Sequence, residues 1–443
     1  MTAAVRPMQS GHRRVTWRSP ALWLTIVVIG YGAWQIGKFG YPNFVNYPRA
    51  AALAVVLFGL YAIPYTLLVT GLDYLEPEPV SLIGTALAWG GLAATAVGVT
   101  GGQALQGILA KLISPAFSDQ WSPAIVGPTI EEPAKFLGVI MIVLLAKGQL
   151  NSVVDGVVYG AFVGLGFQLV ENFMYAMYAV AISGNGDTVS PVVATFLVRG
   201  FLSGLWSHTM FTALAGAGIG YALVAVRRPW WRRLGIAACA FVGAWGLHFV
   251  WNSPLLINGF GGGLGGIAAV LLIKGLPGLL LVLVLVGAAK RSESRYYADT
   301  LLKLEDPGLA TPGEIDTLCH ARRRHAARRY AKARGGLKAQ LLVRRLQMAQ
   351  AKLAVAISRA QGNPAGTVYD VAGRFRDPVA VVERREQEVR MLRGRMLGLG
   401  ISDAAAPTEV RHRVHWNGLL FRVVLVVVGA VALAVVIRRL GGG

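Results

Sequence analysis

The chain has few charged residues and almost no cysteine. Asp, Glu, Lys and Arg make up 15% of its 443 residues, against about a quarter in soluble globular domains. Hydrophobic residues make up 54% and the mean hydropathy is +0.52, which excludes an ordinary soluble globule. The two cysteines, Cys239 in an apolar run and Cys319 in a basic segment, cannot easily face each other. We therefore expect neither a disulfide nor a metal–thiolate site.

What the chain has instead is a series of long apolar runs. Runs of roughly 17–25 residues are long enough to cross about 30 Å of hydrocarbon. We predict an all-α polytopic membrane protein with about eight transmembrane helices in its core, a basic helical insert and a C-terminal anchor helix. The predicted spans are residues 21–37, 51–70, 80–101, 123–146, 153–181, 192–226, 234–252, 265–288 and 417–437.

Acidic residues are also scarce, with 22 against 43 basic ones and a net charge of +21. The basic residues gather before the first predicted span (Arg13 and Arg14), after the sixth (Arg227 and Arg228) and after the eighth (Lys290). The loops between the other spans have few of them. The positive-inside rule therefore predicts a multi-pass protein of the cell membrane whose N-terminus is cytoplasmic.

Residues 290–415 form a basic segment with helical patches that are broken at Gly335–Gly336 and at Gly362. We expect a cytoplasmic helical region whose Arg faces lie on anionic lipid, because each basic residue near such a surface contributes about 1 kcal/mol. Aromatic residues do not alternate with the basic ones as they do in a nucleic-acid groove, so no specific nucleic-acid partner is expected. The last apolar run is expected to be an anchor only.

Two adjacent carboxylates, Glu131 and Glu132, lie inside a predicted span together with Lys135. A charge in the hydrocarbon core costs at least about 2.5–3.5 kcal/mol, so such a residue seldom lacks a function. On a helix, Lys135 is four and three residues from the two acids and can pair with either. Two acids for one base leave a spare negative charge, which a purely structural ion pair would avoid.

The next predicted span begins with small residues and ends with a polar group. Its glycines recur every fourth residue, at Gly156, Gly160 and Gly164. Such a ridge lets a neighbouring helix approach closely. The ridge is followed by Phe167, Glu171 and Asn172. We therefore expect an acid and an amide to lie close to the contact between two packed helices.

Histidine appears in the two spans that follow. His208 is expected near the middle of the sixth span, and His248 and Asn252 share one helical face near the end of the seventh. With the predicted topology, the acids and imidazoles of four spans fall in the outer half of the bilayer and can share one site. The alternative for His208 is a satisfied helix–helix hydrogen bond, and for the His248–Asn252 pair a helix-terminal polar cluster.

Three motifs occur in order on successive spans: EEPAK at 131–135, FQLVEN at 167–172 and HFVWN at 248–252. With these EExxK, FxxxEN and HxxxN patterns, the chain resembles the PrsW family of intramembrane proteases, distant relatives of the CAAX-processing and bacteriocin-immunity (CPBP) proteases. The resemblance covers roughly residues 50–290. It implies site-1 cleavage of a single-pass membrane protein, typically an anti-sigma factor, near its extracytoplasmic face.

The resemblance also suggests how the chain is divided. Residues 1–50 would hold the cytoplasmic N-terminus and the first transmembrane helix, and residues 51–289 the intramembrane protease core. Residues 290–415 would be the basic cytoplasmic region, and residues 416–443 the C-terminal anchor.

Roles for the acids follow from the resemblance. Glu131 would be the general base that activates water, while Glu132 and Lys135 would set its charge. Glu171 stands where the CAAX relatives have His, so it would form a coupled pair with Glu131 that supplies an acid and a base together.

The remaining motif residues would act around this pair. His248 and Asn252 would donate hydrogen bonds to the developing oxyanion, and His208 would be a further acid or would orient the substrate. Phe167 and Asn172 would support the site. No cofactor is expected in this metal-free mechanism.

Other readings remain open. Zinc bound by Glu131, Glu171, His208 and His248 is the alternative within the enzyme class, although no HExxH motif is present. Outside it, a transporter or proton-coupled channel also uses intramembrane carboxylates, but such folds usually carry an internal repeat, which we do not find. A catalytically silent scaffold or immunity protein of the same fold is the third alternative.

Overall fold

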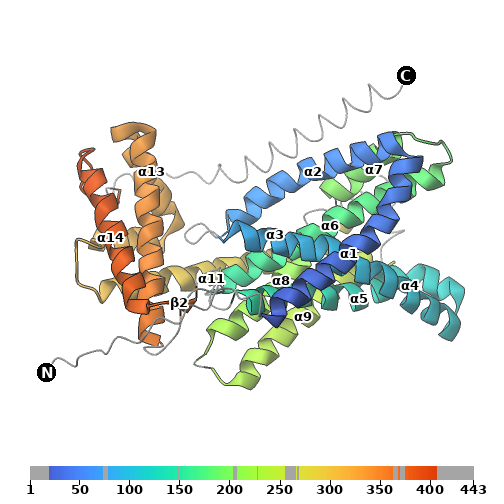
Figure 1. The fold of residues 1–443 in the computed structure, drawn as a ribbon, viewed down its shortest axis with the longest axis horizontal. Helices are drawn as coiled ribbons and strands as arrows, with labels where there is room; N and C mark the ends of the chain where they lie inside the picture. The colour runs from blue at the N-terminus through green and yellow to red at the C-terminus, as the bar shows by residue number, and fades with distance from the viewer. Residues whose placement is uncertain are drawn as a thin grey trace. The chain divides into compact units, whose positions relative to one another are not determined.

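The computed structural model describes residues 19–72, 78–146, 150, 152–202, 207–226, 228–254, 266, 269–362, 368–369 and 375–406. The chain divides into two compact units, which we describe separately (Figure 1). The membrane unit comprises residues 24–144 and 150–290, and the basic unit is built mainly from the described residues of 291–414.

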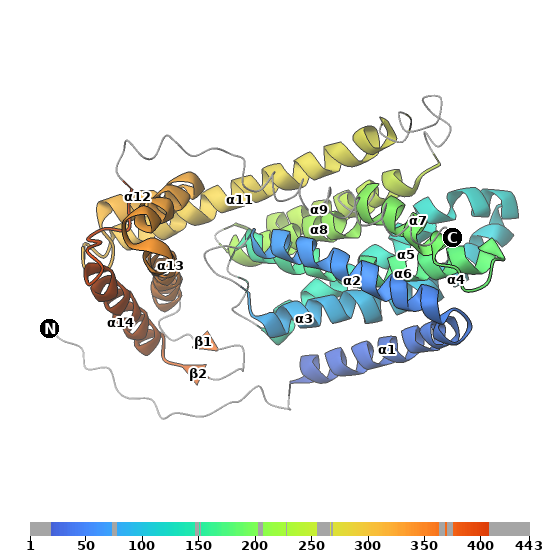
Figure 2. The ribbon, with the colours of Figure 1, turned by 90° about the horizontal axis from the view of Figure 1, so that it is seen from above.

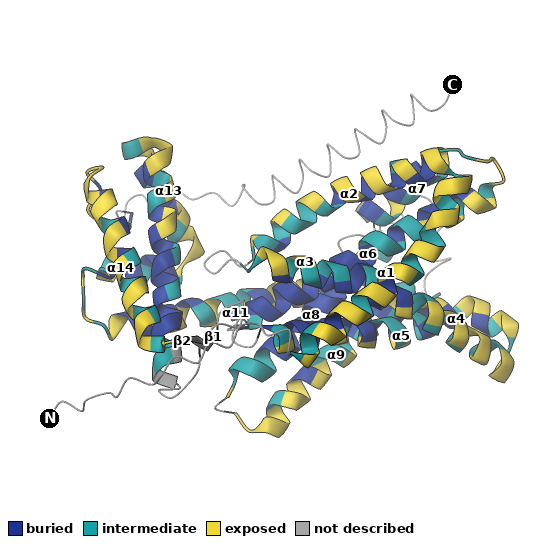
Figure 3. Cartoon of the chain, viewed as in Figure 1, coloured by how far each residue is buried: buried dark blue, intermediate teal, exposed yellow. Residues whose placement is uncertain are grey.

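The membrane unit is a bundle of apolar helices. Its elements are α1 (Pro20–Asn46), α2 (Pro48–Thr70), α3 (Val80–Ala88), η1 (Trp89–Ala94), α4 (Thr95–Leu112), α5 (Pro115–Leu145), α6 (Val153–Ser183), α7 (Ser190–Thr195), η2 (Phe196–Leu202), α8 (His208–Val224), α9 (Trp230–Asn252), η5 (Leu271–Gly275) and the first part of α11 (Leu276–Leu302), whose residues from 291 on belong to the basic unit. Helix α6 contacts α2, α3, α7, η1 and α8, and α8 contacts α9 (Figures 1 and 2). The buried residues are concentrated along α6 and α8, whereas α1 is largely exposed (Figure 3).

The glycine ridge of α6 is what brings it so close to α8. A Cβ added at Gly156 would lie 2.2 Å from the carbonyl oxygen of Gly216, and one at Gly164 would lie 2.2 Å from the carbonyl oxygen of His208. Only a residue without a side chain allows the two backbones to pack at this distance. This contact places the start of α8 directly beside the polar end of α6.

The sixth predicted span, residues 192–226, is interrupted within the described residues. The chain forms α7 and then the π-helix η2, and α8 begins only at His208. Ser207, just before α8, has non-helical backbone angles (φ −119°, ψ −149°). Irregular backbone at membrane depth is tolerated where it is buried in protein or lines a polar cavity, and π-helical turns often mark functional sites.

Six helices in the described part of the chain are long and apolar enough to cross a membrane: Pro20–Asn46, Pro48–Thr70, Val80–Leu112, Val153–Ser183, Trp230–Asn252 and Leu271–Leu302. Helix α5 is as long as α6 but carries Glu131, Glu132 and Lys135, and α8 is shorter than a full span. The predicted count of eight core spans stays a prediction. The predicted anchor, 417–437, lies outside the described residues.

The basic unit has its own hydrophobic core. Its elements are α12 (Pro312–Cys319), α13 (Ala321–Gly362), β1 (Val368–Tyr369), β2 (Phe375–Arg376) and α14 (Pro378–Leu397). Helix α13 contacts both α12 and α14, and Leu318, Leu346 and Met396 are fully buried between them. The break expected at Gly335–Gly336 is present as a kink, with a φ of 67° at Gly336. The short antiparallel pairing of β1 with β2 was not predicted.

A buried carboxylate ties this unit together. Glu314 is 1% exposed and accepts hydrogen bonds from Arg393 Nη2 at 2.5 Å, from Gln350 Nε2 at 2.8 Å and from the Ala404 backbone at 3.0 Å. It therefore joins α12, α13, α14 and the segment that follows α14. Asp403 lies beside it, and burial raises the pKa of the Asp403 carboxyl, with the Glu314 charge adding to the effect.

Candidate active site

The three charged residues of α5 lie on one side of that helix, as their spacing requires. Lys135 Nζ is 2.6 Å from Glu132 Oε1 and 3.4 Å from Glu131 Oε2. The side chains of Lys135 and Glu132 are 0% and 1% exposed, whereas that of Glu131 keeps 14%. Glu132 is therefore the acid that the lysine neutralises most directly, and Glu131 is the one that stays accessible.

His248, on α9, is oriented by α5. Its Nδ1 is 2.8 Å from Glu132 Oε1, and because a carboxylate only accepts, Nδ1 carries the proton. The bare Nε2 accepts from Asn252 Nδ2 at 2.9 Å, and Asn252 also donates to the carbonyl oxygen of Pro123 at 2.9 Å. The Phe211 ring stacks on the imidazole at 5.0 Å. The ring of His248 is thus fixed on both edges and on one face.

His208 is oriented in the same way by α6. Its Nε2 donates to Glu171 Oε2 at 2.8 Å, which leaves Nδ1 without a proton. Nδ1 accepts from Lys135 Nζ at 2.9 Å. His208 is the first residue of α8, not a mid-helix residue as its place in the sequence suggests. The Phe167 ring, 4.8 Å from the imidazole and 4.3 Å from Lys135 Nζ, packs against both.

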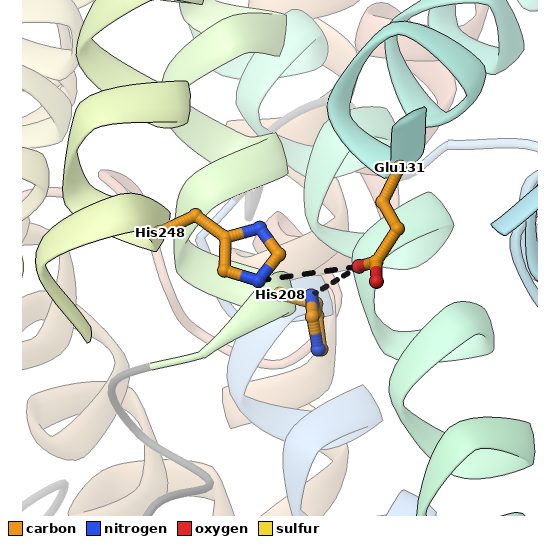
Figure 4. A group of neighbouring side chains, drawn as sticks. All are labelled: Glu131, His208 and His248. Atoms are coloured by element: carbon orange, nitrogen blue, oxygen red, sulfur yellow. Dashed lines mark ion pairs between the residues drawn. The ribbon is translucent and has the colours of Figure 1, made fainter. Parts of the chain in front are cut away.

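The two bare imidazole nitrogens converge on one carboxylate oxygen. Glu131 Oε2 is 3.8 Å from His208 Nδ1 and 4.0 Å from His248 Nε2, as the dashed lines of Figure 4 show. The donor atoms of Glu131, His208 and His248 all lie within 4.8 Å of one another. The zinc alternative also included Glu171, which is not part of this group. Glu171 instead accepts a hydrogen bond from His208 Nε2 and so orients that imidazole.

Arg199 completes the site and was missed in the sequence. It projects from η2, and its guanidinium donates to Glu171 Oε2 at 2.5 Å and to Asn172 Oδ1 at 2.8 Å while it stacks over Tyr175. The signal was an arginine inside an apolar run, which is as costly in the membrane as an acid. Glu171 is thus paired with Arg199 and His208, and its coupling to Glu131 stays a prediction.

The eight motif residues and His208 are therefore brought together, but several of them point differently than expected. His248 and Asn252 were expected to donate hydrogen bonds to the developing oxyanion. In the structure His248 is bound to Glu132 and Asn252 is bound to His248, so these contacts orient the two side chains instead. Three carboxylates face the two cations Lys135 and Arg199, which leaves one net negative charge when the histidines are neutral. Such a charge in a largely buried site favours a bound cation.

The donor set fits a divalent metal. Two imidazole nitrogens and one carboxylate oxygen are a common protein ligand set of catalytic zinc, which leaves a position for water. Metal-binding histidines usually donate their other N–H to a carboxylate or carbonyl, as His208 and His248 do here. Glu132 Oε2 is buried without a hydrogen-bond partner among the described residues, which is expected where an ion or a water completes a site.

The fold and the site define a multi-pass helical membrane protein with a Glu/His cluster between its helices. Residues 78–286, just under half of the chain, match a family model described as PrsW family intramembrane metalloprotease. The matched segment contains every residue of the cluster. A search of the curated proteins and a search of the solved structures found no match.

The family match suggests intramembrane proteolysis as the activity of the membrane unit. Its description names a metalloprotease, so it does not support the metal-free mechanism expected from the sequence. The wider placement beside the CAAX and CPBP proteases stays a prediction.

Proposed function

We propose that this protein is an intramembrane endopeptidase whose Glu131, His208 and His248 hold a divalent metal, with zinc the best candidate. The observation that carries the proposal is the orientation of the two imidazoles. Glu171 and Glu132 each take the proton-bearing nitrogen of one histidine, and the two remaining lone pairs face Glu131 Oε2 at 3.8 and 4.0 Å. These lone pairs accept from Lys135 Nζ and Asn252 Nδ2 in the structure, and a metal would take the place of both donors.

A metal bound there would polarise the scissile carbonyl and supply a nucleophilic water at neutral pH. The protein's own residues do the rest. Glu132 and Glu171 fix the tautomer and the angle of the two imidazoles, and Arg199 fixes Glu171. Glu132 Oε2, buried and unpartnered among the described residues, would be an additional hydrogen-bond acceptor beside this site. The apolar helices around the cluster limit its contact with bulk water and so strengthen each of these interactions.

For the substrate, we propose a single-pass membrane protein of the anti-sigma-factor kind, cut near its extracytoplasmic face. Support comes from the family resemblance and from the location of the cluster among helices α5, α6, α8 and α9. The proposed orientation, with the N-terminus and residues 290–415 in the cytoplasm, is supported by the distribution of Lys and Arg. Anionic lipid is the proposed partner of the basic unit.

The test uses full-length protein reconstituted in liposomes with a candidate single-pass substrate. E131Q, H208A and H248A should each lower cleavage by more than about 100-fold, beyond the 10–100-fold typical of residues that only orient metal ligands. E383Q and H320A remove the same groups from exposed positions of the basic unit and should cleave like wild type. Normal cleavage by all three cluster variants would exclude this site.

The same preparation separates the two protease chemistries. For the metal-dependent reaction, 1,10-phenanthroline should abolish cleavage and added Zn²⁺ should restore it. If carboxylates alone activate water, protein stripped of metal should cleave at the wild-type rate. That result would instead support the metal-free mechanism, in which Glu131 is the general base.

A further inference from the structure

Lys135 reaches the same atoms that a metal would use. Its Nζ lies 2.9 Å from His208 Nδ1 and 3.4 Å from Glu131 Oε2, and these are two of the three proposed ligand atoms. The side chain is completely buried. A lysine ammonium is a compact point charge that donates to oxygen and nitrogen lone pairs. It can therefore satisfy, in part, the same groups as a small metal ion.

The two cations cannot use His208 at the same time. A neutral imidazole has one bare nitrogen, and here the other nitrogen, Nε2, donates to Glu171. The lone pair of Nδ1 is thus available either to Lys135 or to a metal, but not to both. Metal binding at Glu131, His208 and His248 requires Lys135 Nζ to leave Nδ1.

The lysine has a second partner to which it can withdraw. Glu132 Oε1 is 2.6 Å from Nζ, and the Phe167 ring lies on another side at 4.3 Å. The flexible four-carbon stem of lysine allows a small shift between these partners and the ligand atoms. Without Lys135, three carboxylates would face Arg199 alone, which would leave two net negative charges in a largely buried site.

We propose that Lys135 is a tethered cation that occupies the metal position of the metal-free protein and withdraws onto Glu132 when the metal binds. This inference rests on the metal role proposed above but not on proteolysis itself. It assigns Lys135 two effects: it keeps the empty site close to charge balance inside the membrane, and it lowers the affinity of the site for any divalent cation.

The experiment measures zinc binding, with Zn²⁺ titrated into the metal-free full-length protein in competition with a chromophoric chelator. K135M is compared with R199M. Each variant removes one cation that is bonded to a carboxylate orienting one histidine, but Arg199 contacts neither ligand nitrogen nor Glu131 in the described structure. Both variants lose an orienting partner, which by itself weakens metal affinity by about 10–100-fold, but only K135M also loses the competing ammonium. K135M should therefore bind Zn²⁺ at least about tenfold more tightly than R199M.

Removing Lys135 alone strands the buried Glu132 charge, so K135M can fail to fold. The comparison is therefore repeated in a background without that charge, as E132Q/K135M against E132Q/R199M. These two proteins have the same net charge, and only the first lacks the lysine. The same order of affinities, with the K135M protein tighter, is expected.

Equal affinities within both pairs would mean that Lys135 acts only through its charge, and this would overturn the proposal, as would weaker binding by the K135M proteins. Absence of zinc binding in wild type and in every variant would overturn it as well. If wild type binds zinc but cleaves no substrate, the protease assignment fails, while the affinity comparison still decides the role of Lys135.

Discussion

Gly164 offers a sharp test of how closely the catalytic geometry depends on the contact between α6 and α8. In G164A the new Cβ would lie 2.2 Å from the carbonyl oxygen of His208, which is a backbone atom and cannot rotate away. Ordinary contact begins at 3.4 Å, so the two backbones must separate by about 1.2 Å. The 2.8 Å hydrogen bond between His208 Nε2 and Glu171 would then exceed hydrogen-bonding distance.

We expect a large loss of activity for a small loss of stability. Overpacking costs about 1–3 kcal/mol, and replacing a helical glycine by alanine returns about 0.5–1 kcal/mol. A displacement of about 1 Å at a catalytic group can cost about 100-fold in rate. Cleavage in liposomes and thermal unfolding would be measured on the same preparations.

The matched control is G246A on α9. A Cβ at Gly246 meets nothing within 4 Å, so this variant should keep wild-type cleavage and be as stable as wild type or slightly more so. If G164A cleaves as fast as G246A, the close approach of α6 and α8 does not set the position of His208, and the reasoning is wrong.

Three further outcomes are expected. R199Q removes both hydrogen bonds that hold Glu171 and Asn172 and should reduce cleavage by about 10–100-fold; unchanged cleavage would show that Glu171 needs no support. The pKa of Asp403 is raised by burial and by Glu314, so its contribution to stability is complete below about pH 4 and is lost as pH rises through the raised value. D403N should therefore stabilise the basic unit at pH 7 but not at pH 4, as measured by amide hydrogen exchange in α12 and α14; destabilisation at pH 7 would contradict this. A cysteine at Gly362 should react with an impermeant reagent only after permeabilisation of the cells, and labelling of intact cells would reverse the proposed topology.

The sequence was sufficient to select the residues of the site but not their pairing. Helical spacing alone puts Lys135 within reach of Glu131 and Glu132, and the structure contains both contacts. The spacing of His248 and Asn252 likewise gives the contact between them. These are local relations, which the helix period determines.

The relations that decide the chemistry are not local. Which nitrogen of His208 is bare depends on Glu171, which lies 37 residues away, and Glu171 is in turn bound by Arg199 from the π-helix η2 before α8. A hydropathy pattern cannot predict a π-helix or the break at Ser207, because both preserve the apolar character of the segment. The main support for the metal alternative, the orientation of the imidazoles, therefore cannot be derived from the sequence alone.

The ion pair between Lys135 and Glu132 has a consequence for the biogenesis of the protein. Because the two residues are three apart on one helix, the pair can form as soon as α5 is helical, before α6, α8 and α9 have been synthesised or packed. Each unpaired charge would add about 2.5–3.5 kcal/mol to the cost of partitioning α5 from the translocon into lipid. Because it carries its own counter-charge, α5 would have a lower cost of insertion before the later helices pack, and Glu131, at 3.4 Å from Lys135, would be the less fully neutralised of its two acids.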